Sequence, residues 1–189
     1  DIKGYDFKQS IGKGGCGEVF LATDKITKKK VAIKKPLEGK IPQNFSSLYI
    51  REIYIMAKMN SLSPYFLPLA GYTVEPPYCI ITDYMQKGSL HKYYQLNTAN
   101  PIFNGTQSQI IAIQILLGIN SMHSRGFIHR DLKLGNILLD QDNTPKIADL
   151  GLSRVKTSNN LMTCKIGTLH TMAPEVYNGQ PYTYSADVY

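Results

Sequence analysis

The sequence contains two polar segments close together: His129-Arg130-Asp131-Leu132-Lys133-Leu134-Gly135-Asn136 and Asp149-Leu150-Gly151. Phosphoryl transfer from ATP needs metal held against the phosphates and a carboxylate that takes the proton of the acceptor hydroxyl. Asp131 suits the second task, and Lys133 can neutralise charge on the transferred group. Asn136 and Asp149 offer the hard oxygen ligands that Mg²⁺ prefers. Each residue alone is also a common turn former, but their combination in this order favours a phosphoryl-transfer site.

The interval between the two segments predicts a β-hairpin. Residues 137–139 and 146–148 are short apolar runs, and the turn-forming residues Asp140, Gln141, Asp142 and Asn143 lie between them. Such a pattern is typical of two antiparallel strands joined by a tight turn. Asn136 and Asp149 are then expected to flank the open end of the hairpin.

A buried ion pair is predicted upstream. In Val31-Ala32-Ile33-Lys34, strand alternation places Lys34 on the same face as the small Ala32. A helix predicted over 46–59 places Glu52 inside its apolar stripe, where a carboxylate needs a cation. A lone strand lysine is usually solvated, yet a pair between Lys34 and Glu52 would satisfy both groups and aim the ammonium at phosphate.

A glycine-rich loop precedes these elements. The run Gly12-Lys13-Gly14-Gly15-Cys16-Gly17-Glu18-Val19 would let backbone amides approach phosphate oxygens. A dinucleotide-binding loop would continue directly into a helix, whereas 18–22 continues as a strand. The loop is therefore interpreted as the cap of a hairpin over its ligand, and the alternative is a glycine turn without a ligand.

The predicted secondary structure changes along the chain, from strands to helices. Strands are predicted over 17–23, 30–34 and 78–82, whereas 86–126 has helical character. The segment Thr106 to Arg125 is apolar nearly all round and is followed by Gly126, which predicts a helix buried in the core.

Composition narrows the classes of function. The 189 residues carry 21 Lys and Arg against 14 Asp and Glu, a net charge of +7. The excess is spread evenly, without the basic stripe and interleaved aromatics of a nucleic-acid-binding protein, so no nucleic-acid partner is expected. Cys16, Cys79 and Cys164 are few and far apart, which favours a reducing, cytoplasmic compartment. No stretch is long and apolar enough for a bilayer, so this segment is expected to make no membrane contact, although a longer parent protein could be tethered.

The ordered motifs resemble the eukaryotic protein kinase family over residues 5–189. The resemblance implies an α+β, bilobal fold: a small antiparallel β-rich lobe with one helix over residues 1–85, and a mainly helical lobe, incomplete here, over 86–189. It implies ATP and Mg²⁺ as cofactors, bound in the cleft between the lobes, and protein substrates.

The resemblance also assigns roles to residues. Asp131 is the implied base, with Lys133, Lys34 and Glu52 as its catalytic partners, and Asn136 and Asp149 are the implied magnesium ligands. Thr82 would guard the back of the adenine pocket, and Met56, Leu69, His129 and Leu150 would form a stacked regulatory column. The implied ATP-binding residues are Ile11, Gly12, Lys13, Gly14, Gly15, Cys16, Gly17, Val19, Ala32, Lys34, Thr82, Asp83, Met85 and Leu138.

Three positions depart from the family pattern. Cys16 stands where the glycine loop usually has an aromatic tip, Leu150 replaces the middle Phe of the metal-binding tripeptide, and Thr171 stands where Tyr often precedes Met-Ala-Pro-Glu. None removes a catalytic group, and the expected consequences concern loop dynamics, the packing that switches the site on, and the peptide-binding shelf.

The acceptor hydroxyl is indicated only in part. Lys133 together with Gly167-Thr168 resembles serine/threonine kinases, and Gly88-Ser89-Leu90 resembles the tyrosine-kinase-like group, so dual specificity stays open. The alternative function is a pseudokinase-like nucleotide-binding scaffold, impaired by truncation. Loss of Lys34, Asp131 or Asp149 would favour that alternative, but all three residues are present.

Two further expectations concern the region after Asp149. Ala173-Pro174-Glu175 resembles the end of the activation segment. A phosphate in this segment would pair with Arg130, and Thr163 is the first candidate site, followed by Thr157 and Ser158. Thr168 is expected to contact the catalytic loop instead.

The last residues, Ala186-Asp187-Val188-Tyr189, resemble the first turn of the central helix of the large lobe. Asp187 is expected to accept hydrogen bonds from the backbone around His129 and Arg130. Without the remainder of that lobe, the helix over 106–125 is expected to lose part of its cover and to expose an apolar patch. Residues 1–189 alone are therefore expected to pack loosely and to show little activity.

Overall fold

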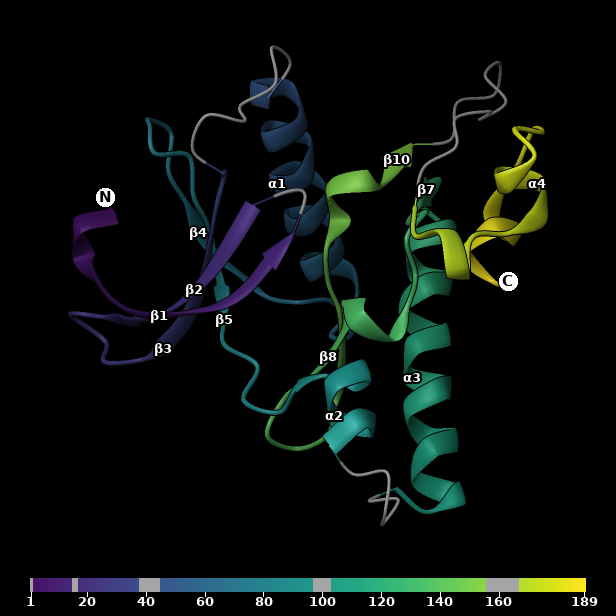
Figure 1. The fold of residues 1–189 in the computed structure, drawn as a ribbon, viewed down its shortest axis with the longest axis horizontal. Coiled ribbons are helices and arrows are strands. Elements are labelled where there is room, and N and C mark those ends of the chain that lie inside the picture. The colour runs from purple at the N-terminus through teal and green to yellow at the C-terminus, as the bar shows by residue number, and fades with distance from the viewer. Residues whose placement is uncertain (1, 15–16, 38–44, 97–102, 156–166) are drawn as a thin grey trace.

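The computed structural model describes residues 2–14, 17–37, 45–96, 103–155 and 167–189 (Figure 1). Cys16, Gly15, Cys164 and the three predicted phosphorylation sites Thr157, Ser158 and Thr163 lie outside these ranges. In Figure 1 the large sheet lies on one side, α3 stands on the other, and α1 and β8 lie between them.

A five-stranded antiparallel sheet forms the first part of the chain, in the order β1-β2-β3-β5-β4. A 3₁₀ turn at Ile2–Gly4 precedes it. The strands are β1 (Tyr5–Gly14), β2 (Gly17–Asp24), β3 (Lys30–Lys35), β4 (Leu69–Tyr72) and β5 (Ile80–Asp83). The three strands predicted from the sequence are present, each within two residues of its predicted start.

Side-chain alternation divides this sheet into two faces. Val31 and Ile33 of β3 are buried on one face, in a cluster with Ala22, Cys79 and Ile81. Ala32 and Lys34 therefore project from the other face. The register pairs Ala32 with Thr82 and Lys34 with Val19, so these four side chains line the face that is directed toward the site.

Helix α1 (Phe45–Leu62) connects β3 to β4 and is longer than the predicted 46–59. Its buried face carries Ile55, Met56 and Met59, which belong to the main hydrophobic cluster. The opposite face exposes Ile50 and Tyr54. The apolar period of the sequence identified this helix correctly, as expected for a helix whose one stripe is buried.

The second part of the chain is mainly helical and carries short strand pairs. Helix α3 begins with a capping box, in which Asn104 accepts from the Gln107 backbone and the Gln107 side chain accepts from the Asn104 backbone. The elements are β6 (Gly88–Ser89), α2 (Leu90–Leu96), α3 (Gly105–His123), β7 (Phe127–Ile128), β8 (Ile137–Leu139), β9 (Pro145–Ile147), β10 (Arg154–Val155) and α4 (Pro174–Tyr177). Strands β6, β8 and β9 form one small sheet, and β10 pairs with β7. The chain has the α+β architecture that was expected, while the lobe boundary after residue 85 stays a prediction.

Helix α3 is buried along one side only, so the expected burial nearly all round is wrong, whereas the exposed apolar patch expected on this helix is present. Only Ile111, Gly118, Ile119 and Met122 of α3 are buried. The side chains that project from its other side are half exposed or more: Ile110, Ile113, Leu116 and Leu117. The reason is that no element in the described part of the chain packs on that side, so an apolar composition did not translate into burial.

The main hydrophobic cluster joins α1, α3 and the β8–β9 hairpin. Phe66 and Ile147, each 1% exposed, lie near its centre. Gly118 of α3 lies so close to Ile147 that an added Cβ would approach its Cδ1 to 2.7 Å. The hairpin that carries the polar segments is therefore packed tightly against α3. Within the described ranges, no helix combines the length and the apolar character needed to cross a membrane.

Candidate active site

The segment between β7 and β8 holds Asp131 in a network of hydrogen bonds. Lys133 donates from Nζ to Oδ2 of Asp131 at 2.8 Å, and Asn136 donates from Nδ2 to the same oxygen at 3.0 Å. Thr168 donates its hydroxyl to Oδ1 at 2.7 Å. The carboxylate is thus fixed in position from three sides, and the predicted contact of Thr168 with the catalytic loop is confirmed.

These contacts set the charge of Asp131. Burial by itself would raise the pKa of this carboxyl, but hydrogen bonds from Lys133 and Thr168, the Lys133 charge and Asn136 together hold the pKa below its usual value. Asp131 is therefore ionised at neutral pH and ready to accept a hydrogen bond from an incoming hydroxyl.

The β8–β9 hairpin brings Asn136 and Asp149 together, as the sequence predicted. Ile137 pairs with Ile147, and the Ala148 amide donates to the Asn136 carbonyl at 2.9 Å. Asp149 follows with a left-handed backbone, φ 60° and ψ 64°, which is uncommon for a residue other than glycine. Asp149 therefore turns away from the course of the strand at the point where the predicted metal ligands meet.

The predicted ion pair between Lys34 and Glu52 is present. Nζ of Lys34 lies 2.7 Å from Oε1 of Glu52 and 3.4 Å from Oδ1 of Asp149. Glu52 also lies close to Gly151, where an added Cβ would meet its Oε2 at 3.2 Å. Strand β3, helix α1 and the Asp149 segment thus converge on one ammonium group.

The glycine-rich loop joins β1 to β2 as a hairpin, with Gly14 opposite Gly17. Gly17 is needed for the fold, because its φ is +145° and a Cβ would come within 2.4 Å of the Lys35 carbonyl oxygen. At Gly12 and Gly14 a Cβ would meet nothing within 4 Å. The absence of side chains at these two positions has no packing reason in the described structure, and it fits a loop whose backbone approaches a ligand.

The sequence profile of the family described as "Protein kinase domain" matches residues 5–189. The chain belongs to the protein kinase family. The match covers every element of the kinase domain described above, from the β1–β2 hairpin to α4.

Individual kinases are similar over most of the chain. The serine/threonine-protein kinase STY46 of Arabidopsis thaliana is 32% identical over 190 residues, covering 100% of this chain and 32% of that protein. The serine/threonine/tyrosine-protein kinase HT1 of the same plant is 35% identical over 158 residues, covering 82% of this chain and 38% of that protein. Human NUAK family SNF1-like kinase 1 is 33% identical over 180 residues, which cover 94% of this chain and 26% of that protein. The chain spans about a third of the length of STY46 and HT1.

The predicted ATP-binding residues of this kinase domain differ in how far they are buried. Val19, Ala32 and Leu138 are half-buried. Thr82 is buried, with its hydroxyl 3.5 Å from the Ala32 carbonyl oxygen. The other predicted ATP contacts in the described chain differ in exposure: Ile11, Gly12, Lys13, Gly14 and Asp83 are exposed, whereas Gly17 and Met85 are buried. Their contact with nucleotide stays a prediction.

The four residues predicted to form a regulatory column, Met56, Leu69, His129 and Leu150, are buried or partly buried, and their regulatory role stays a prediction. Met56 and Leu150 lie in the main hydrophobic cluster, and Leu69 packs against it. His129 is fully buried, and its burial lowers its pKa despite the nearby carboxylates. Its neutral ring fits both hydrogen bonds: Nε2 donates to the Ala148 carbonyl at 3.1 Å, and Nδ1 accepts from the Asp131 amide at 3.3 Å. Leu150, the departure from Phe, is 2% exposed and packs well.

The predicted role of Asp187 is confirmed. Its Oδ2 accepts from the His129 amide and its Oδ1 from the Arg130 amide, both at 2.7 Å. His123, which the sequence reasoning missed, adds a contact from Nε2 to Oδ2 at 2.8 Å. Burial would raise the pKa of Asp187, but the His123 contact and the two amides lower it. Asp187 thereby holds the catalytic loop at Arg130, whose φ of 73° is itself unusual.

Arg51 is a second residue that the sequence reasoning missed. It donates from a terminal nitrogen to the Gly151 carbonyl at 3.0 Å. Burial, together with repulsion from Arg154 and Arg130, lowers its pKa. Within the described residues, its buried Nε has no hydrogen-bond partner. Arg51 therefore experiences the positive charge of both Arg130 and Arg154.

Proposed function

We propose that this chain forms the catalytic core of a protein kinase that transfers the γ-phosphate of ATP to serine and threonine hydroxyls of proteins. The observation that carries the proposal is the ionised Asp131 carboxylate, held by Lys133 and Thr168 near Asn136 and Asp149, which flank the β8–β9 hairpin. A positioned carboxylate that accepts the proton of a hydroxyl and oxygen ligands for a metal are the groups that this reaction requires.

Each residue has a task that its contacts support. An acceptor hydroxyl would donate to Asp131, and the Lys133 ammonium, already at 2.8 Å from that carboxylate, would offset negative charge on the transferred group. Lys34, oriented by Glu52 at 2.7 Å, would contact the phosphates of ATP. Asn136 and Asp149 would hold Mg²⁺, whose charge offsets that of the phosphates. The donor set fits this ion, because Mg²⁺ is usually bound by one or two protein oxygens together with phosphate and water.

Serine and threonine are the proposed acceptors because Lys133 and Thr168 are hydrogen-bonded to each other and to the Asp131 carboxylate. Nζ of Lys133 donates to the Thr168 hydroxyl at 2.5 Å, which joins the catalytic loop to the start of the peptide-binding region. STY46 is named a serine/threonine kinase, and HT1 is named a serine/threonine/tyrosine kinase. Dual specificity is therefore the second candidate. A scaffold without catalysis is not favoured, because Lys34, Asp131 and Asp149 all occupy positions suited to transfer.

The test is ATP-dependent phosphorylation of generic basic substrate by the full-length protein that contains this chain. Matched peptides with Ser, Thr or Tyr as the single acceptor would be compared. We expect transfer to Ser and Thr at rates within the range of about 1 to 100 per second that is usual for kinases. Transfer to the Tyr peptide at a similar rate would establish dual specificity, and transfer to none of the three would contradict the proposal.

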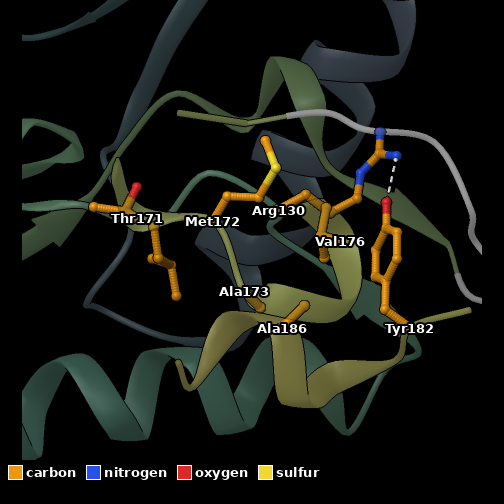
Figure 2. Close-up of a pocket in the computed structure, with 8 residues that line it drawn as sticks. Arg130, Thr171, Met172, Ala173, Val176, Tyr182 and Ala186 are labelled. Carbon is orange, nitrogen blue, oxygen red and sulfur yellow. Dashed lines mark hydrogen bonds between the residues drawn. The ribbon is translucent and has the colours of Figure 1, made fainter. Parts of the chain in front are cut away.

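We also propose that a phosphate group in the segment after Asp149 binds to Arg130, with Arg51 and Arg154 nearby. In this structure Arg130 donates to the Leu152 carbonyl and, from its other terminal nitrogen, to the Tyr182 hydroxyl at 3.4 Å. Figure 2 shows this contact beside a pocket that Met172 and Val176 help to line. A phosphate would offset the positive charge that Arg130 and Arg154 place near Arg51, through charge-assisted hydrogen bonds.

Mass spectrometry of the active protein is expected to find phosphate on Thr163, with Thr157 and Ser158 as the next candidates. Replacing the modified residue with alanine should lower turnover roughly tenfold, the effect of losing one hydrogen bond between charged groups. Arg154→Gln, which changes an exposed side chain, should weaken that dependence on phosphate. Active protein without phosphate at any of these three positions would count against the proposal.

A reducing compartment, the cytoplasm, is part of the same proposal. Cys79 is a free thiol in the described part of the chain and is fully buried, and its burial raises its pKa. Such a thiol is inert toward oxidation, which is typical of structural cysteines in reducing compartments.

A further inference from the structure

The hydroxyl of Tyr49 lies between two backbone segments at the end of the β4–β5 pair. Its Oη is 2.8 Å from the Thr73 carbonyl oxygen and 2.8 Å from the Cys79 carbonyl oxygen, and it accepts from the Thr73 amide at 3.2 Å. The side chain is 8% exposed, and its burial raises the pKa of the phenol. A buried neutral hydroxyl thus connects α1 to both strands.

The segment that Tyr49 contacts is itself well fixed. The Thr73 amide donates to the Cys79 carbonyl at 3.0 Å, closing the strand pair. The Thr73 hydroxyl donates to the Pro77 carbonyl at 2.7 Å and accepts from the Cys79 amide at 2.8 Å. The ring of Tyr49 packs on that of Tyr78, with centroids 5.4 Å apart. The end of β4–β5 is therefore a rigid point to which a helix can be attached.

The position of Tyr49 on α1 connects this attachment to the active site. Tyr49 lies three positions before Glu52, so the two side chains are neighbours on one side of the helix. Asn60 lies 11 positions after Tyr49, close to three turns of about 3.6 residues each, and so faces the same way. Asn60 donates to the Leu67 carbonyl at 3.0 Å and accepts from the Leu69 amide at 2.7 Å. Two polar attachments to the backbone around β4 thus bracket Glu52.

We propose that Tyr49 is a positioning residue for phosphoryl transfer: its hydroxyl holds α1 against β4–β5 so that Glu52 reaches Lys34. The inference rests on the proposed kinase function. The apolar contacts of α1 are non-directional and tolerate sliding or rotation of the helix. The hydrogen bonds of Tyr49 specify one position, in which Oε1 of Glu52 lies 2.7 Å from Nζ of Lys34.

Tyr49→Phe tests the proposal, because it removes the hydroxyl and keeps the ring that packs on Tyr78. Tyr54→Phe is the matched control, since it makes the same change on the exposed side of the same helix, where Tyr54 is 52% exposed. In the full-length protein we expect Tyr49→Phe to lower kcat about 3- to 10-fold, the effect of about one lost hydrogen bond. The KM values for ATP and peptide should change less than about twofold, and Tyr54→Phe should leave all three constants unchanged.

Two further measurements separate positioning from general stability. Amide hydrogen exchange of α1 and of residues 73–79 should be faster in Tyr49→Phe than in wild type, while α3 exchanges as before. In the Glu52→Gln background, the additional effect of Tyr49→Phe on kcat should disappear, because the positioned carboxylate is already absent.

Equal kcat in Tyr49→Phe and wild type would overturn the proposal, as would an undiminished effect of Tyr49→Phe in the Glu52→Gln background. Unchanged exchange in α1 would overturn it as well. Absence of transfer by the wild-type protein would instead contradict the proposed function itself, and the exchange measurement would still show whether the Tyr49 hydroxyl restrains α1.

Discussion

Replacing Asp131 with asparagine is expected to lower kcat by about 10²- to 10⁴-fold, the usual contribution of a positioned acid or base. The amide is neutral and cannot take the proton of the acceptor hydroxyl. Nucleotide affinity should stay nearly unchanged, because the groups proposed to bind ATP and Mg²⁺ are Lys34, Asn136, Asp149 and the glycine loop. Single-turnover transfer and calorimetric binding of ADP with Mg²⁺ would measure the two quantities separately.

Asp142→Asn provides the matched control. It makes the same chemical change in the exposed β8–β9 turn, only a few residues from the active site in the sequence. Its kcat should equal that of wild type. Raising the pH should not restore the Asp131→Asn enzyme. Asparagine has no group that titrates in this range. In wild type, the pKa of the Asp131 carboxyl is below its usual value, so the carboxylate is already ionised above about pH 5. Near-wild-type turnover by Asp131→Asn would falsify the catalytic assignment.

Replacing Asp149 with asparagine is expected to remove the dependence of nucleotide binding on magnesium. The variant loses a negative charge next to the proposed metal position, and its oxygen is a weaker ligand for a hard cation. Asparagine tolerates the left-handed backbone that Asp149 adopts, at φ 60°, so the change adds little strain. Affinity for ADP in the presence of Mg²⁺ should fall roughly 10- to 100-fold, or about 1.4 to 2.8 kcal/mol, with a parallel loss of kcat.

Calorimetric titrations with ADP in excess Mg²⁺ and in excess EDTA would test this expectation. Wild type and Asp131→Asn should both bind more tightly with Mg²⁺, whereas Asp149→Asn should bind about equally under the two conditions. The pair of variants therefore separates loss of the base from loss of the metal ligand. A full magnesium effect in Asp149→Asn would show that this carboxylate is not a metal ligand.

Much of the candidate site was predictable because its geometry follows from local patterns. The hairpin between Asn136 and Asp149 consists of two short apolar runs joined by turn-forming residues. This local pattern is typical of two antiparallel strands. The pair of Lys34 and Glu52 was predictable because a strand and a helix each carry one charged residue on a side that faces the protein. A partly buried charge is stable only next to an opposite charge, so each residue indicates the other. Both predictions were confirmed by contacts of 2.9 Å and 2.7 Å respectively.

The burial of α3 was not predictable from its own residues. Ile113 and Leu116 are as apolar as Ile119 and Met122, yet the first two are 55% and 58% exposed while the others are buried. Which side of an apolar helix is covered depends on the elements that pack against it, and those are distant in the sequence. Composition therefore identified the helix but did not determine which of its sides is covered.

The sequence by itself determined the family, the two long helices, the β8–β9 hairpin and the residues proposed for chemistry, because these follow from motifs and local patterns that are visible without coordinates. Only the tertiary structure decided which side chains hold these residues in place. Arg51 reaches a carbonyl 100 residues away at Gly151, and Tyr49 reaches carbonyls 24 and 30 residues away. Every residue carries a backbone carbonyl, so no sequence pattern marks the one that a distant side chain will contact, and folding alone brings the two together.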